Sequence, residues 1–273
     1  MLFFRKIYIE SISILYLMGD KIKIGIIGGS GLDNPDILKN SKDTNILTNF
    51  GKPSSVIKEG TIGDIDVAIL ARHGLDHSIS PTGVNFRANI DALKQIGCTH
   101  IIATTACGSL RTKIDRGHFV VLDQFIDFTR HRNVTFFDEF PGGAANAKHT
   151  PMAKPFDETL RNILIDSAEE LGIKTHKTGT VITIEGPRFS TIAESKVFKS
   201  WGADVINMSV APECALANEA GIPYAAIAMS TDYDVWKEDE EPVEWEEILK
   251  VFGKNVNNVT KLLTNSIPKI IKQ

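Results

Sequence analysis

Two carboxylates lie one residue apart near the end of the chain, directly after an apolar run. The run Tyr224–Met229 is typical of a buried strand, and Asp232 and Asp234 follow its carboxyl end. Side chains at positions i and i+2 of an extended chain point the same way, so both acids are expected to face one ligand. Burial and mutual repulsion would raise the pKa of one acid, which could then protonate a leaving group near neutral pH. Taken alone, the segment fits a strand-end turn with solvated acids equally well.

Groups suited to binding an anion follow three other strand-like segments. Ser30 lies in the glycine turn 28–32, where free amides and a hydroxyl can form a phosphate nest. Arg72 and His73 follow the second strand, and a guanidinium fork matches the oxygens of a phosphate. The hydroxyl-rich segment 104–109 follows the third strand. Each segment by itself also fits a simple glycine turn or a surface Arg–His pair.

Two further segments offer surfaces for a flat ring or a sugar. Phe189 comes shortly after the strand-like run Thr180–Ile184 and can stack on a base, a contact that contributes roughly 1–3 kcal/mol. Met208 ends the apolar run 205–208, although a methionine in such a run is more often part of the core. With the acids and the anion ligands, these side chains complete the set of candidate site residues.

The elements that position these residues alternate between strand-like and helix-like segments. Short apolar runs bounded by glycine or polar residues predict buried strands at 22–27, 67–71, 101–105, 119–122, 180–184, 205–208 and 224–229. Apolar stripes at helical spacing predict helices at 86–97, 155–172, 190–201, 213–220 and 244–267. The alternation predicts a single α/β domain with a twisted, mostly parallel or mixed central sheet flanked by helices.

Composition narrows the class of protein. The chain has 273 residues, of which 42% are hydrophobic and 23% charged, so it can bury a large core. A formal net charge of −4 argues against nucleic acid as the main partner. Cys98, Cys107 and Cys214 lack metal-ligand spacing and fit reduced thiols in the cytoplasm. Neither a metal site nor a disulfide framework is expected.

Residues 1–17 are expected to lie outside the folded domain. They are apolar, but Arg5, Lys6 and Glu10 interrupt them, and the run is too short to span a bilayer. No small-residue cleavage site precedes Gly19, which argues against a signal peptide. A second methionine, Met18, comes just before the first convincing strand. The segment is therefore predicted to be a disordered arm or an artefact of start-codon choice, with one domain over residues 18–273 and no membrane partner.

Beyond the individual motifs, the chain resembles the trimeric branch of the purine nucleoside phosphorylase family. The resemblance covers about residues 22–267 and rests on seven segments in this order and spacing: GIIGGSGL, ARHG, TTACGSL, DQFIDFT, TIEGPRFST, ADVINMS and AMSTDYDVWKE. It implies phosphorolysis of S-methyl-5′-thioadenosine to adenine and 5-methylthioribose 1-phosphate, with phosphate as co-substrate and no cofactor. The alternatives are a broader purine nucleoside or 5′-methylthioinosine phosphorylase, a nucleoside hydrolase, and a nucleoside-binding protein without turnover.

The resemblance also assigns roles to individual positions. Phosphate would be held by Ser30, Arg72, His73, Thr105, Ala106 and Ser209. Phe189 would contact the base and Met208 the ribose. Asp232 would protonate the purine at N7 with Asp234 tuning it, and an acid at position 232 favours a 6-aminopurine.

Two more implications concern the 5′ end of the nucleoside. Substrate specificity would depend on Ser190, Trp245, Ile248 and Leu249. His149 matches a residue that reaches into the 5′ site of the neighbouring subunit, which implies a homotrimer.

Overall fold

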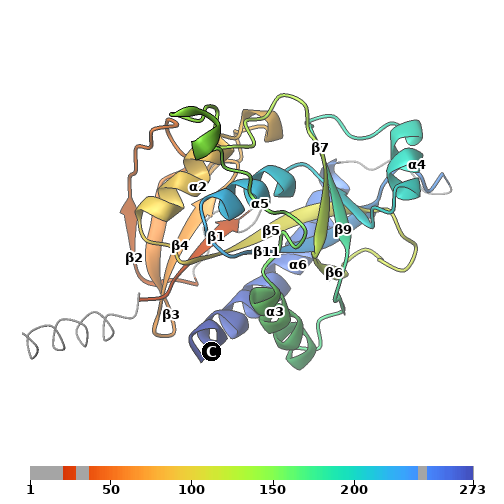
Figure 1. Ribbon diagram of the computed structural model, residues 1–273. Coiled ribbons are helices and arrows are strands. Elements are labelled where there is room, and N and C mark those ends of the chain that lie inside the picture. The colour runs from red at the N-terminus through yellow and green to blue at the C-terminus, as the bar shows by residue number, and fades with distance from the viewer. Residues whose placement is uncertain (1–20, 29–36, 239–244, 273) are drawn as a thin grey trace, which may run out of the picture.

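A mixed β-sheet lies between two layers of helices (Figure 1). A computed structural model of the protein describes residues 21–28, 37–238 and 245–272. Within these residues the sheet consists of β1 (Lys23–Gly28), β2 (Lys39–Thr44), β3 (Ile57–Ile62), β4 (Ile65–Ala71), β5 (His100–Ser109), β6 (Phe119–Val121), β7 (Gln124–Phe128), β8 (Thr175–His176), β9 (Thr180–Ile184), β10 (Val205–Asn207) and β11 (Tyr224–Tyr233). The α-helices are α2 (Phe86–Gln95), α3 (Glu158–Glu170), α4 (Ile192–Ser200), α5 (Val210–Glu219) and α6 (Trp245–Ser266).

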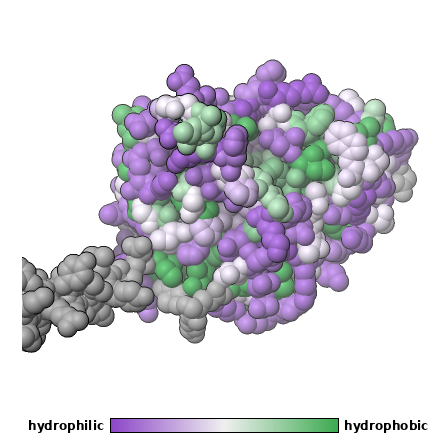
Figure 2. All heavy atoms as spheres, in the orientation of Figure 1, coloured by the Kyte–Doolittle hydropathy of each residue, from purple (hydrophilic) through white to green (hydrophobic). Residues whose placement is uncertain are grey.

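Each face of the sheet has its own hydrophobic core. Helices α2 and α5 cover one face and α3 and α6 the other, while α4 packs against β9 and β10 near the β7 end of the sheet (Figure 1). In β1, Ile27 packs with Leu93 and Leu216 on the first face, whereas Ile26 packs with Leu164 and Leu263 on the second. A strand buried on both faces has an uninterrupted apolar sequence, which explains the apolar runs. The outer surface in Figure 2 is largely hydrophilic, with smaller hydrophobic patches.

Strand β5 changes partner along one of its edges. Its first residues pair in parallel with β1, up to Ala103, and its last two residues pair antiparallel with β10, from Gly108. Within the described part of the chain, residues 104–107 therefore have no strand partner on that edge. On the other edge β11 runs parallel to β5 as far as Ser109. Ligands of open α/β sheets bind where the strand order switches in this way.

The predicted fold class is confirmed, and all seven predicted strands and five predicted helices are present. The prediction missed β2, β3, β7 and β8, of which β2 has the sequence KNSKDT and is exposed for most of its length. The helix predicted from Pro155 begins at Glu158, because the side chain of Asp157 accepts a hydrogen bond from the backbone N–H of Leu160 and caps it. Residues 1–17 lie outside the described residues.

The two longest strands extend past their predicted ends. β5 continues to Ser109 and β11 to Tyr233, so Gly108 and Asp232 lie within strands and not in loops after them. The two strands hydrogen-bond to each other over this extension, with a register shift between Ser230 and Asp232. This pairing supplies the backbone hydrogen bonds of both extensions, whose polar sequences gave no indication of a strand. Among the described residues, no helix combines the length and apolar character required to traverse a bilayer.

The start of α4 generates a prediction about stability. The side chain of Thr191 accepts a hydrogen bond from the backbone of Glu194, whose carboxylate in turn accepts from the backbone of Thr191. Thr191→Ala should lower the free energy of unfolding by about 1 kcal/mol, since it removes one half of this capping box. Thr264→Ala is the matched control, because the exposed Thr264 hydroxyl bonds only to a carbonyl of its own helix. Thermal denaturation in which both variants melt alike would contradict the assigned cap.

Candidate active site

A cavity of about 550 Å³ lies where β5 changes partner. It is lined by ten of the predicted site residues: Arg72, His73, Thr105, Ala106, Phe189, Ser190, Met208, Ser209, Asp232 and Asp234. Their side chains come from the ends of β4 and β10, from the middle of β5 and from the end of β11, with α4 and α5 beginning nearby. The structure therefore brings five of the six predicted phosphate ligands, the ring contacts and the acids to one site.

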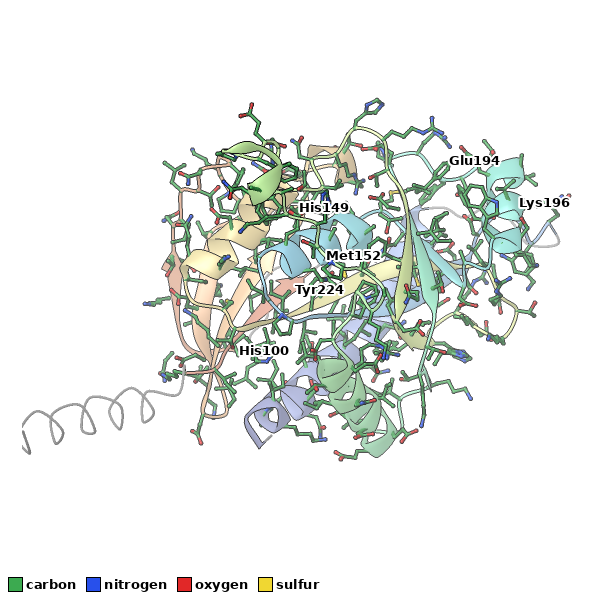
Figure 3. The ribbon with its side chains drawn as sticks, in the orientation of Figure 1. His100, His149, Met152, Glu194, Lys196 and Tyr224 are labelled. Atoms are coloured by element: carbon green, nitrogen blue, oxygen red, sulfur yellow. The ribbon has the colours of Figure 1, made fainter. Side chains whose placement is uncertain are left out.

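Five predicted residues are not part of this cavity as described. Ser30 lies outside the described residues, and so do the side chains of Trp245, Ile248 and Leu249 in α6. His149 lines a separate cavity beside α5, together with Met152 and Phe140. The His149 and Phe140 rings pack edge to face, with their centroids 5.9 Å apart. Figure 3 shows His149 and Met152 close to α5.

Hydroxyls and a helix start form one end of the cavity. Ser209 is the N-cap residue of α5, yet its side chain makes no capping hydrogen bond and lies 3.4 Å from the hydroxyl of Thr105. The first backbone N–H groups of a helix carry partial positive charge and bind anions. Two hydroxyls beside such a helix start can donate to the oxygens of a phosphate.

A buried ion pair, which the sequence did not predict, holds Arg72 at this end of the cavity. Its Nε and Nη2 donate to the two carboxylate oxygens of Glu213 in α5, and Nη1 donates to the carbonyl oxygen of Thr104 at 2.9 Å. Arg72 is 1% and Glu213 0% exposed. The pair is therefore locally neutral, and Arg72 can contribute directed N–H donors to a phosphate but little net charge.

His73 is held in one tautomer. Its Nδ1 lies 2.9 Å from the carbonyl oxygen of Ile79, which only accepts hydrogen bonds, so Nδ1 carries the proton. Burial, assisted by the neighbouring charge of Arg72, lowers the pKa of His73 to about 4. The ring is neutral at pH 7, and its Nε2 is left as a hydrogen-bond acceptor.

The two acids form the opposite end of the cavity. Burial raises the pKa of Asp234, opposed by the nearby hydroxyls of Ser195 and Ser190. A raised pKa was predicted for one of the two acids, and Asp234 shows it, with burial as the largest cause. Asp232 accepts a hydrogen bond from Thr231 at 2.6 Å. Oδ2 of Asp234 makes no well-formed hydrogen bond among the described residues and is available to a polar edge of a ligand.

Gly108 allows the acids to lie against β5. A Cβ atom at this position would come within 3.0 Å of Asp232 Oδ2 and 3.4 Å of Asp234 Cβ. A side chain here would therefore press on the Asp232 carboxyl group, whereas glycine leaves it in place. The glycine of the TTACGS segment therefore shapes the acid end of the cavity, a role that the sequence left open.

Arg132 positions the apolar wall of the site. Its guanidinium donates to the carbonyl oxygen of Met208 at 2.6 Å and to Glu185, and it lies over the ring of Phe86. Phe189, by contrast, is 45% exposed at the rim, where a bound ring could cover it. Arg132 lies three residues beyond the DQFIDFT segment. No local sequence pattern indicated its role, because the partners that bury it are distant in sequence.

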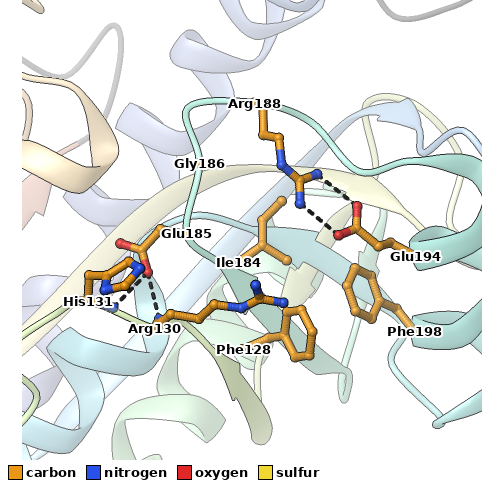
Figure 4. Close-up of a pocket in the computed structure, with 9 residues that line it drawn as sticks. All are labelled: Phe128, Arg130, His131, Ile184, Glu185, Gly186, Arg188, Glu194 and Phe198. Atoms are coloured by element: carbon orange, nitrogen blue, oxygen red, sulfur yellow. Dashed lines mark hydrogen bonds and ion pairs between the residues drawn. The ribbon is translucent and has the colours of Figure 1, made fainter.

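A second cavity of about 300 Å³ adjoins the first at Ile184 (Figure 4). It contains the guanidinium of Arg130 over the ring of Phe128 and the double ion pair of Arg188 with Glu194. Of the residues predicted from sequence to act in the site, none lines this cavity. The described residues also contain no group of three or more potential metal ligands.

The chain matches a family model described as "Phosphorylase superfamily" over residues 23–268. It is 55% identical over 250 residues to an S-methyl-5′-thioadenosine phosphorylase of Xenopus tropicalis, covering 91% of this chain and 89% of the relative. A second such enzyme, from Danio rerio, is 53% identical over 249 residues, again covering 91% of this chain and 89% of the relative.

Solved structures agree with this assignment. Methylthioadenosine phosphorylase of Schistosoma mansoni in complex with adenine is 43% identical, covers 93% of each chain and superposes with a TM-score of 0.88. A mutant of adenosine/methylthioadenosine phosphorylase from the same organism, in complex with methylthioadenosine, has the same identity and coverage and a TM-score of 0.87. The predicted resemblance is confirmed: the chain belongs to the phosphorylase superfamily, among the S-methyl-5′-thioadenosine phosphorylases.

Proposed function

We propose that the cavity at the β5 partner change catalyses phosphorolysis of S-methyl-5′-thioadenosine, which yields adenine and 5-methylthioribose 1-phosphate. The observation that carries the proposal is that anion donors and an acid pair line opposite ends of one cavity. A nucleoside bound between them would present its C1′ atom to phosphate and its base to the acids. The bond from C1′ to N9 then breaks, its electron pair leaves with adenine, and a phosphate oxygen bonds to C1′.

Phosphate binding is assigned to the end of the cavity beside α5. Thr105, Ser209 and Arg72 donate hydrogen bonds to its oxygens, and the backbone of Ala106 lies on the unpaired edge of β5. Preorganised donors of this kind hold a desolvated anion without moving during the reaction. Ser30 is proposed to join them from the glycine turn. The neutral His73 offers Nε2 to a hydroxyl of the phosphate or the sugar.

The acid pair is assigned to the leaving base. Departure of adenine leaves negative charge on the purine, and a proton delivered to N7 stabilises it. Asp232 is proposed as the acid at N7, and Asp234, whose pKa is raised by burial, as the neighbour that tunes it. Phe189 and Ser190 cover the base, and Met208 lies against the ribose. No cofactor is required by this chemistry.

Assembly and specificity at the 5′ end extend the proposal. We assign the 5′-methylthio pocket to Met208, Trp245, Ile248 and Leu249, and to His149 of a neighbouring subunit in a homotrimer. The exposed His149 and the half-exposed Phe140 on the segment before α3 offer an unfilled surface for that contact. Residues 18–273 would form one phosphorylase domain. Three free, buried cysteines support a location in the cytoplasm.

The first prediction is that release of adenine depends on phosphate. Ser209→Ala removes a donor without removing a helix cap, and should raise the KM for phosphate roughly tenfold or more. Arg72→Ala should cost about 2–4 kcal/mol of transition-state stabilisation. Because this variant also leaves Glu213 unpaired, Ser209→Ala is the cleaner measurement. Equal turnover of the wild-type protein in phosphate-free buffer would favour a nucleoside hydrolase.

The second prediction concerns the base. Asp232→Asn should strongly reduce phosphorolysis of methylthioadenosine and improve, relative to it, the use of 5′-methylthioinosine, since an amide can pair with N7 but cannot protonate it. The two substrates differ only in the base, so the ratio of their kcat/KM values isolates its recognition. Asp234→Asn, the same change two residues away, is the matched variant and should leave that ratio nearer to the wild-type value. A ratio unmoved by Asp232→Asn would show that Asp232 does not recognise the base.

The third prediction joins the assembly to the 5′ site. Light scattering should give a mass three times that of the 30.0 kDa chain. His149→Ala should raise the KM for methylthioadenosine without affecting that for phosphate, whereas His131→Ala, another exposed histidine of the same segment, should change neither. A fully active monomer would refute the shared site.

The same pocket should prefer a methylthio group to a hydroxyl. Burial of the apolar group contributes roughly 1–2 kcal/mol, which predicts a preference for methylthioadenosine over adenosine of about tenfold or more. Equal kcat/KM values for the two nucleosides would overturn this preference and leave the phosphorolysis intact.

A further inference from the structure

A chain of buried polar side chains leads from the start of α5 to the cavity. It runs through Thr183 at the end of β9 and Asn207 at the end of β10, which are paired in the parallel β9–β10 ladder. These residues are 0% and 5% exposed. Asn207 lines the cavity, whereas Thr183 lies behind it. Because buried polar groups require partners, their hydrogen bonds indicate what the pair does.

The hydrogen bonds of the chain all point in one direction. The backbone N–H of Ala211, in the first turn of α5, donates to Oγ1 of Thr183 at 3.1 Å. The hydroxyl of Thr183 donates to Oδ1 of Asn207 at 2.8 Å. This bond orients the amide so that its Nδ2 group faces Thr105 and donates to Oγ1 of that residue at 3.3 Å. Each member thus accepts from the helix side and donates toward the cavity.

The direction of these hydrogen bonds determines where the hydroxyl proton of Thr105 can be donated. A hydroxyl carries a single proton, and Thr105 donates it to the carbonyl oxygen of Ala106 at 2.9 Å. Asn207 donates to the Thr105 oxygen and does not need the Thr105 proton, because its own acceptor is already bonded to Thr183. A bound phosphate can therefore accept this proton in place of the Ala106 carbonyl. With the amide reversed, Oδ1 of Asn207 would face Thr105 and compete with phosphate for the same proton.

We propose that Thr183 and Asn207 are positioning residues for phosphate, which orient the hydroxyl of Thr105 as a donor into the cavity. The proposal rests on the phosphorolysis proposed above. Thr183 contacts neither substrate and acts only through Asn207 and Thr105. Its effect should therefore fall on phosphate binding and not on the nucleoside.

A pair of substitutions at Thr183 provides the test. Thr183→Val keeps the shape of the side chain but removes its hydroxyl, so that the amide of Asn207 is no longer oriented. It should weaken binding of inorganic phosphate about tenfold in calorimetric titration without nucleoside, and raise the KM for phosphate to a similar extent. The KM for methylthioadenosine should stay within twofold of the wild-type value. Thr183→Ser retains the hydroxyl and should restore phosphate binding.

Asn207→Asp is a second, independent test of the positioning role. A carboxylate accepts from both threonines and also repels phosphate, so this variant should bind phosphate less well than Thr183→Val. Thermal denaturation and circular dichroism identify any variant that fails to fold, in which case Asn207→Ser takes its place.

The outcomes separate this proposal from the assigned function. Phosphate binding by Thr183→Val equal to that of the wild type, or an equal rise in both KM values, would overturn the positioning role while the phosphorolysis stands. Wild-type turnover that needs no phosphate would overturn the function, and the calorimetric titrations would still decide whether Thr183 orients an anion site. A wild-type protein that neither requires nor binds phosphate would overturn both.

Discussion

The buried pairing of Arg72 with Glu213 connects the elements that surround the cavity. Arg72 follows β4, its Nη1 group donates to the Thr104 carbonyl in the stretch of β5 between its pairing with β1 and with β10, and its other donors bind Glu213 in α5. The hydroxyl of Tyr224 at the start of β11 donates to the same carboxylate at 2.9 Å. Loss of either charge would leave the other buried and unpaired, a change that commonly costs about 3–5 kcal/mol. The same interaction therefore holds β4, β5, β11 and α5 together and positions Arg72 in the site.

Neutralisation of Arg72 has a consequence for the proposed phosphate site. With Glu213 cancelling the charge, the proposed attraction for phosphate would come from directed donors: the hydroxyls of Thr105 and Ser209, the guanidinium N–H groups and the start of α5. His73, neutral at pH 7, adds no positive charge either. Donors fixed by the fold need no reorganisation when charge develops, whereas a bare cation would bind product and substrate phosphate with similar strength.

Local patterns predicted the fold and most of the site, because buried strands are apolar on both faces and because polar residues at strand ends stand out against them. Ten predicted residues line the cavity on that basis. Glu213, Arg132 and Thr183 were not predicted, since each matters through a partner distant in sequence: Glu213 and Arg72 are 141 positions apart. The predicted ends of β5 and β11 were wrong for a related reason. Their polar extensions are stabilised by pairing with each other, which no local pattern records.

That extension also sets the distance between the two ends of the cavity. Had β5 ended at Thr105, as its apolar run suggests, this strand would not reach the two acids. Instead the strand carries Thr105 at the proposed phosphate end and Gly108 against Asp232 and Asp234, three residues further on. An extended chain rises about 3.3 Å per residue, so these positions lie about 10 Å apart on a strand held by β11. A ribose fits between two groups at this spacing, and in the proposed reaction a rigid strand would hold the attacking phosphate and the acid at a fixed separation.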